Sequence, residues 1–271
     1  MADFIDSLNG IIWSNWLVYL CLGAGAYFTL VTLFLQIRCL PDMIQQLKAG
    51  ESSEQGISSF QSLMISLAGR VGVGNIAGVA TAIAFGGPGA VFWMWLVALL
   101  GSATSFVECC LAQIYKEPDR DTGEYRGGPA FYIEKAYKHT SARPFMLVYA
   151  VIFAICMLLA TSYFLPGIQA NGVAAAVDNA WGVNVWISAA VMAALLGFII
   201  IGGVKRIANF ASMVVPFMAG IYIIVAIIVL FANASDIPHV FGMIFRAAFD
   251  KEAAFSGMLG AAIMWGVKRG I

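Results

Sequence analysis

Charged residues are scarce in this chain of 271 residues. Aspartate, glutamate, lysine and arginine together make up 11% of it, against roughly a quarter of an ordinary soluble domain. The formal net charge is zero. This argues against a nucleic-acid partner, because proteins that bind nucleic acids usually carry a surplus of basic residues. The shortage of charge therefore argues against an ordinary soluble protein, and its balance argues against a nucleic-acid-binding protein.

Residues that hold metals or act as nucleophiles are also few. The chain has two histidines and five cysteines, and the cysteines show no metal-binding spacing. Most of them lie in apolar runs, which is typical of small hydrophobic side chains in helices rather than of a disulfide framework. The sequence shows no nucleophile-base-acid set and no Walker-type phosphate loop. It therefore favours neither an enzyme nor an ATP-driven pump, and it predicts no cofactor.

Hydrophobic residues, in contrast, make up 61% of the chain, and its mean hydropathy is +0.86. Several apolar runs exceed the length of about 18 residues that spans a bilayer. We therefore predict an all-α, polytopic membrane protein in a lipid bilayer. The predicted spans are about 11–35, 60–85, 90–115, 144–177, 183–204, 210–231 and a seventh that starts near 253. We also expect a polar loop with a surface helix at 41–59, an interfacial helix at 130–137 and an amphipathic turn at 240–249.

The orientation follows from the distribution of basic residues. The loop 116–143 is the most charged part of the chain, and the positive-inside rule places it in the cytoplasm. With that orientation, ten of the fifteen basic residues fall on one side of the membrane. We therefore predict a multi-pass protein of the cell (plasma) inner membrane, with its N-terminus outside.

The most unusual of the predicted spans is the second, because it combines an apolar sequence with closely spaced glycines. Glycine weakens a helix, so we expect this helix to break between Gly72 and Asn75 and to resume near Ile76. A broken backbone at membrane depth must be buried in protein or face a polar cavity, and such cavities are typical of transporters. The alternative is that the glycines only allow close helix packing. The presence of Arg70 and Asn75 favours a break.

Three motifs in this chain resemble those of the alanine or glycine:cation symporter family. Gly-Val-Gly-Asn-Ile-Ala-Gly-Val begins at Gly72, Gly-Gly-Pro begins at Gly127, and Trp-Gly-Val-Lys-Arg-Gly-Ile begins at Trp265. They occur in the family's order and spacing. The resemblance implies a sodium-coupled carrier of small neutral amino acids such as alanine or glycine.

The resemblance also implies a LeuT-type inverted-repeat core. Residues 1–59 are then an extra N-terminal transmembrane helix and a cytoplasmic loop, and residues 60–232 are the first five-helix repeat. Residues 233–271 are an external loop and the start of the second repeat. In the family the third motif continues into an unwound polar stretch, which this sequence does not include. We therefore expect the chain to be an N-terminal fragment with half of a binding site, unable to transport alone.

The break supplies the candidate ligands of that site. Free amides and the positive dipole end of the second half-helix suit an amino-acid carboxylate. Asn75 offers both an amide oxygen and an NH₂ group, so it suits either the substrate or the ion. A glutamine in the fourth span suits the polar ends of a zwitterion. The resemblance adds two carbonyl ligands for Na⁺. The predicted substrate residues are Gly74, Asn75, Ile76 and Gln169, and the predicted Na⁺ ligands are Ala68, Val71 and Asn75. For Asn171, hydrogen bonding between helices is an alternative.

Two charges lie within the predicted membrane spans. Arg70 is about 15 Å from the cytoplasmic start of its helix, and Glu108 is roughly 10 Å from the end of the next one. Because the two helices are antiparallel neighbours, we hypothesise a buried pair that fixes the helices or gates the inner pathway. The alternative is that Arg70 snorkels or caps carbonyl groups at the break.

The leading hypothesis is a secondary transporter that couples Na⁺, or alternatively H⁺, to the uptake of a small amino acid. Its predicted partners are the amino acid, Na⁺ as the coupling ion and the lipid bilayer. A proton-coupled or exchanging carrier of similar fold is the nearest rival, and the sodium dependence of uptake separates the two. A membrane enzyme lacks clustered catalytic residues here, and a channel lacks a filter-like repeat. A structural scaffold would need no broken helix.

Overall fold

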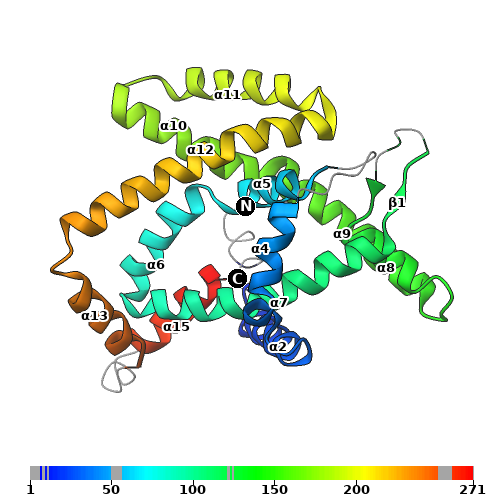
Figure 1. Ribbon diagram of the computed structural model, residues 1–271, viewed down its shortest axis with the longest axis horizontal. Coiled ribbons are helices and arrows are strands. Elements are labelled where there is room, and N and C mark those ends of the chain that lie inside the picture. Colours follow the sequence, from blue (N-terminus) through cyan, green and yellow to red (C-terminus); the bar gives the residue numbers. More distant parts are fainter. Residues whose placement is uncertain are drawn as a thin grey trace. The chain divides into compact units, whose positions relative to one another are not determined.

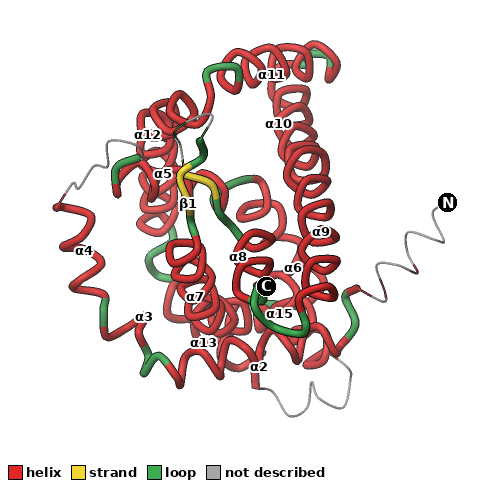
Figure 2. Tube along the Cα trace, turned by 90° about the vertical axis from the view of Figure 1, so that its right-hand side faces the viewer, coloured by secondary structure: helices red, strands yellow, loops and turns green. Residues whose placement is uncertain are grey.

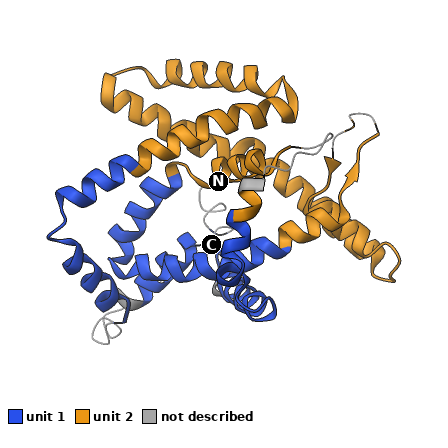
Figure 3. Cartoon of the chain, in the orientation of Figure 1, with its two compact units in different colours: residues 1–44, 74–107, 224–271 blue, residues 45–73, 108–223 orange. Residues whose placement is uncertain are grey.

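A computed structural model describes residues 7, 10, 12–49, 57–120, 123, 125–249 and 258–270. It is 84% helical, which confirms the predicted all-α class. The chain forms two compact units, coloured separately in Figure 3. The first unit contains residues 1–44, 74–107 and 224–271, and the second contains residues 45–73 and 108–223. The LeuT-type repeat and the predicted domain boundaries stay predictions.

The first unit is built on the first part of a long helix, α7. Its elements are α2 (Asn15–Val31), α3 (Leu35–Arg38), η1 (Gly74–Gly78), α6 (Val79–Gly86), most of α7 (Gly89–Tyr115), α13 (Ile237–Phe249) and α15 (Met258–Gly270). Helices α6 and α15 lie side by side (Figure 1). A small core of Val18, Val97 and Val267 joins α2, α7 and α15. The packing of α15 therefore holds the third sequence motif against α6 and α7.

Aromatic rings fix α13 to α7 within this unit. The ring of Phe92 lies 5.7 Å from that of Phe245 and 4.8 Å from that of Phe249, measured between centroids. Trp95 and Phe241 form a further pair at 6.1 Å. The amphipathic segment that the sequence predicts at 240–249 is therefore confirmed, and it is part of a longer helix.

The second unit contains the remaining helices and a short hairpin. Its elements are α5 (Ser59–Arg70), β1 (Glu117–Pro118), β2 (Tyr125–Arg126), α8 (Pro129–Ala136), α9 (Arg143–Leu159), η2 (Ala160–Phe164), α10 (Leu165–Trp181), α11 (Val185–Ile200) and the greater part of α12 (Gly203–Ala232). The strands β1 and β2 are antiparallel. The helix predicted at 130–137 is confirmed as α8, and its position at the membrane interface stays a prediction. Helix α4 (Leu40–Ala49), which begins in the first unit, confirms the surface helix predicted after residue 41.

The start of α5 is fixed by a capping box. The backbone N–H of Gln61 donates to Ser58 Oγ at 3.2 Å, and the backbone N–H of Ser58 donates to Gln61 Oε1 at 3.0 Å. The Gln61 amide also donates to Asn209 Oδ1 of α12 at 2.8 Å. Met64 continues this contact with α12 through a buried cluster that includes Ala211 and Val215. The N-terminal end of α5 is therefore held by these contacts, whereas its C-terminal end leads into the break.

The predicted fourth span is one long helix. Elements α9, η2 and α10 follow one another without a gap (Figure 2). Pro166 lacks an N–H to donate, and the wider π-helical turn η2 directly precedes it, so the helix continues through the proline. The helix ends at Gly182, whose φ of 65° is left-handed, as is common at helix ends.

The predicted first span, 11–35, is wrong as a continuous helix. Helix α2 ends at Val31, and Leu33 and Phe34 both have φ of 54° before α3 begins at Leu35. The hydroxyl of Thr32 donates back to the Phe28 carbonyl at 2.8 Å. Side-chain bonding of this kind competes with the helical pattern, which the apolar run alone does not reveal.

Three described helices are long and apolar enough to cross a membrane. They are Gly89–Tyr115, Arg143–Trp181 and Gly203–Ala232. The pair Ser59–Arg70 and Gly74–Gly86 becomes a fourth if its two parts form one broken span. Helices α2 and α11 are apolar but shorter, at 17 and 16 residues. The described part of the chain thus fits a multi-pass membrane protein.

Candidate functional site

The predicted break in the glycine-rich helix is present. Helix α5 ends at Arg70, and Val71 has extended backbone angles with φ of −104° and ψ of 113°. The helix resumes at Gly74 with the π-helical turn η1. The break therefore covers residues 71–73, and the second half-helix starts two residues earlier than predicted. The difference arises because η1 contains Gly74 and Asn75, which the glycine pattern predicts to be part of the break.

The side chain of Gln169 contacts the break directly. The backbone N–H of Val73 donates to Gln169 Oε1 at 2.9 Å. A Cβ added to Gly72 would lie 2.8 Å from Gln169 Oε1 and 2.9 Å from Nε2, which is closer than atoms normally approach. An alanine at position 72 would therefore displace the Gln169 amide from its present position. Gln169, which is predicted to bind the substrate, thus also accepts a hydrogen bond from a backbone amide at the break.

Gly172, a second residue of α10, also lies against the break. A Cβ on Gly172 would lie 2.7 Å from Cγ1 and 2.8 Å from Cγ2 of Val73. Gln169 and Gly172 are three residues apart, so they lie on one face of α10. The glycine leaves a notch that accepts the valine side chain, while the glutamine accepts the valine N–H. Sequence reasoning missed Gly172, although its spacing from Gln169 was a visible signal.

Asn171 lies between these two positions in α10. A residue two places from Gln169 does not share its helical face, and the Asn171 side chain is exposed. Its predicted role in hydrogen bonding between helices stays open.

The other predicted substrate residues lie in η1, which belongs to the first unit. Gly74, Asn75 and Ile76 follow one another there, and the Ile76 side chain is 61% exposed. Of the predicted Na⁺ ligands, Ala68 lies in the last turn of α5 and Val71 is its C-terminal cap. Their roles as ligands stay predictions. Within the described residues, no cluster of three or more His, Cys, Asp or Glu side chains could hold a metal ion.

Arg70, one of the two charges predicted to lie within the membrane, forms hydrogen bonds within its own helix. The guanidinium of Arg70 donates to the Ser66 carbonyl at 3.3 Å and also contacts Ser66 Oγ. This contact resembles the alternative in which Arg70 caps carbonyl groups near the break. The Arg70–Glu108 pair itself stays a prediction.

Glu108 lies near α8. Burial raises the pKa of the Tyr132 phenol above its ordinary value, and the nearby groups of Glu108 and Tyr149 raise this pKa further. The neighbouring hairpin is joined to α8 by ion pairing of Lys135 with Glu117. Glu108 therefore lies within electrostatic reach of α8.

The third motif packs through its glycines in the first unit. A Cβ on Gly266 would lie 2.7 Å from Trp93 Cβ, and one on Gly270 would lie 2.7 Å from Val97 Cβ. The ring of Trp265 stacks on that of Phe85 at 5.2 Å. Both glycines therefore allow α15 to approach α7 closely.

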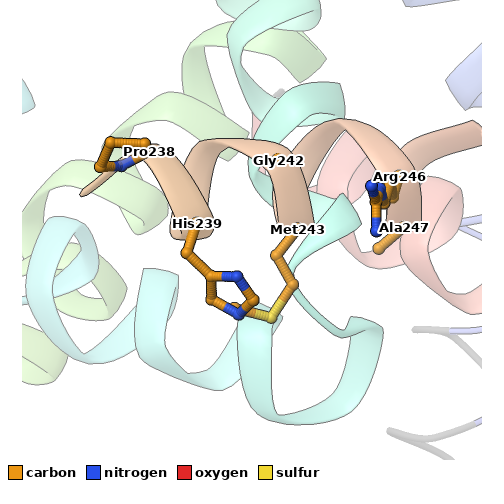
Figure 4. A pocket seen from close by; sticks show the side chains of 6 residues that line it. All are labelled: Pro238, His239, Gly242, Met243, Arg246 and Ala247. Carbon is orange, nitrogen blue, oxygen red and sulfur yellow. The ribbon is translucent and has the colours of Figure 1, made fainter. Parts of the chain in front are cut away.

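A separate hollow of about 400 Å³ lies on α13 (Figure 4). Its lining residues all belong to that helix and are Pro238, His239, Gly242, Met243, Arg246 and Ala247. None of these residues is predicted from the sequence to belong to a site.

Three described apolar helices long enough to cross a membrane, together with a helix pair interrupted at a glycine-rich break, are typical of a multi-pass membrane protein of the transporter class. The chain belongs to the sodium:alanine symporter family, which matches it over residues 1–271. The resemblance that the three motifs indicate is thereby confirmed, and the members of this family are transporters rather than enzymes.

Curated relatives match the whole chain. A Bacillus subtilis protein named "Putative sodium/proton-dependent alanine carrier protein YrbD" is 53% identical over 100% of the chain and 54% of the relative. The "Probable sodium/glutamine symporter GlnT" of the same species is 45% identical over 100% of the chain and 55% of its own length. The "Sodium/alanine symporter AgcS" of Methanococcus maripaludis is 40% identical over 100% of the chain and 59% of its own length. The chain thus spans about half the length of these relatives.

Proposed function

We propose that this chain is part of a secondary active symporter that couples Na⁺ to the uptake of a small neutral amino acid such as alanine or glycine. The observation that carries the proposal is the broken helix whose backbone is held by Gln169. A broken helix at membrane depth needs polar partners, and Gln169 supplies one to Val73. Membership of the sodium:alanine symporter family supports the same function.

The contact at the break leaves the two polar atoms of the Gln169 side chain with different proposed roles. Its Oε1 accepts the N–H of Val73, which leaves the Nε2 group with its two donors for another partner. Donors suit the carboxylate of an amino acid. We therefore propose that the Gln169 amide binds the carboxylate, and Gly74, Asn75 and Ile76 stay the other residues proposed for the substrate.

For Na⁺ we propose the carbonyl oxygens of Ala68 and Val71 and the amide oxygen of Asn75. Na⁺ is a hard cation, and oxygen ligands suit it. The α5 carbonyls lie at the end of a helix, where the last four carbonyl groups have no helical donor. The ion would then neutralise the substrate carboxylate next to it, which couples the binding of the two.

Proton coupling is the second candidate. The relative YrbD is named as a sodium/proton-dependent carrier, so both ions are possible partners of the same site. A glutamine substrate is a further alternative, because the relative GlnT is named as a sodium/glutamine symporter.

Uptake of labelled alanine into proteoliposomes tests the proposal. The assay uses these 271 residues within a chain of the relatives' full length. We expect an inward Na⁺ gradient to drive uptake and a K⁺ gradient without Na⁺ to fail. Asn75→Ala should raise the Na⁺ concentration for half-maximal uptake by roughly tenfold, as for one polar contact to a charged group. Asn171→Ala is the matched control and should leave that concentration unchanged. Uptake driven by a proton gradient and indifferent to Na⁺ would instead support the second candidate.

A further inference from the structure

The guanidinium of Arg269 lies against Gly78, the last residue of η1. A Cβ added to Gly78 would lie 2.8 Å from Arg269 Cζ, 2.9 Å from Nη2 and 3.1 Å from Nε. These three distances are nearly equal. An approach to the edge of the guanidinium would leave Cζ clearly farther away than the nearest nitrogen, so the contact is with its flat face.

The orientation of this group decides what it can bind. The N–H donors of a guanidinium lie in its plane. Because the face of the group covers Gly78, the donors point along the surface of η1 rather than into its backbone. Planar pairs of such donors match a carboxylate.

The packing of α15 brings Arg269 to this position. Gly266 and Gly270 allow α15 to lie close to α7, and Trp265 stacks on Phe85 of α6. Val267, which is 1% exposed, anchors the same turn in the core of the unit. The last turn of α15 therefore presents Arg269 over η1 from a rigid support.

We propose that Arg269 is the residue that selects for the carboxylate of the amino-acid substrate, and that Gly78 is glycine so that the guanidinium can lie there. The inference rests on the proposed function, because η1 holds three of the proposed substrate residues. It assigns the neutral amino acid's carboxylate, rather than its ammonium group, to the α15 side of η1.

Two substitutions test this role by different routes. Arg269→Gln removes the charge and the donor pair. Gly78→Ala keeps the charge but displaces the guanidinium, which is the far end of a flexible side chain and can move at little cost in stability. Gly78 has right-handed helical angles, with φ of −69° and ψ of −37°, so alanine fits its backbone. If Arg269→Gln folds poorly, Gly78→Ala therefore still tests the proposed role.

The controls are matched to each substitution. Lys268→Gln removes the same charge from the same last turn of α15. Gly101→Ala adds the same methyl group at a glycine of α7 that has no atom within 4 Å of the added carbon. Both control variants should behave as the unsubstituted protein.

The measurement compares alanine with alaninamide, which lacks the carboxylate, as substrate and competitor in the full-length uptake assay. Arg269→Gln should raise the half-saturating alanine concentration roughly 10- to 100-fold, while inhibition by alaninamide stays unchanged or strengthens. Gly78→Ala should also raise the half-saturating alanine concentration. The double variant should be no worse than Arg269→Gln alone, because both substitutions remove one interaction.

The outcomes separate this inference from the proposed function. If the unsubstituted protein does not take up alanine with Na⁺, the proposed function is wrong. If it does, and Arg269→Gln weakens alanine and alaninamide equally or acts no differently from Lys268→Gln, the residue only supports the packing of α15 and the inference is overturned.

Discussion

Replacing Gln169 with leucine is expected to reduce Na⁺-dependent alanine uptake strongly. The leucine removes the acceptor of the Val73 N–H, which lies 2.9 Å from Oε1, and it removes the amide donors proposed for the carboxylate. An unsatisfied amide in a nonpolar setting costs about 1–3 kcal/mol, and more where lipid replaces water. Uptake should fall at least about tenfold, and the thermal unfolding temperature in detergent should fall with it.

Gln169→Glu separates the two roles of this side chain. The carboxylate keeps an acceptor for Val73, so the unfolding temperature should stay close to that of the unsubstituted protein. It replaces the amide donors with a negative charge, which repels the substrate carboxylate, so alanine affinity should still be lost. Asn171→Leu is the matched control in the same helix and should affect neither quantity. If Gln169→Leu transports normally, the proposed role of Gln169 at the break is wrong.

Gly172→Ala has the second large expected effect. The added methyl group would lie within 2.8 Å of both γ-carbons of Val73, and a β-branched side chain has few rotamers to escape into. Overpacking of this kind costs about 1–3 kcal/mol. The strain should move the break away from Gln169 and reduce alanine uptake roughly tenfold or more.

A compensating substitution checks that explanation. Val73→Ala removes the γ-carbons, so the double variant Val73→Ala with Gly172→Ala should recover much of the uptake that Gly172→Ala loses. Gly167→Ala in the same helix is the control, because nothing lies within 4 Å of its added carbon. A double variant that is as impaired as Gly172→Ala would show that the contact with Val73 is not the cause.

The helix break is the part of the site that the sequence predicts best. Closely spaced glycines with Arg70 and Asn75 indicate a break, because none of them favours an uninterrupted helix in lipid. Its position differs by two residues, since a π-helical turn and a break contain the same residue types. The break in the first span at Leu33 and Phe34 left no such signal, because both residues are apolar and neither is glycine.

Contacts between distant segments were harder to predict. Gln169 is 96 residues from Val73, and Gly172 and Gly78 are glycines among 28 in the chain. Nothing in a single sequence shows which glycine faces which side chain. Gln169 was predicted as a substrate residue because it is a polar residue in an apolar span, but its bond to the backbone of the break required the structure.

Chemical protection at η1 tests the central claim most directly. Ile76→Cys is introduced into the full-length protein after the native cysteines are replaced by serine, and its labelling by a polar thiol reagent is followed over time. Ile83→Cys in α6 is the control, because that side chain is also exposed, at 40%. We predict that alanine slows labelling at position 76 severalfold only when Na⁺ is present, and never at position 83. Labelling at position 76 that alanine and Na⁺ together leave unchanged would contradict a sodium and amino-acid site at the break.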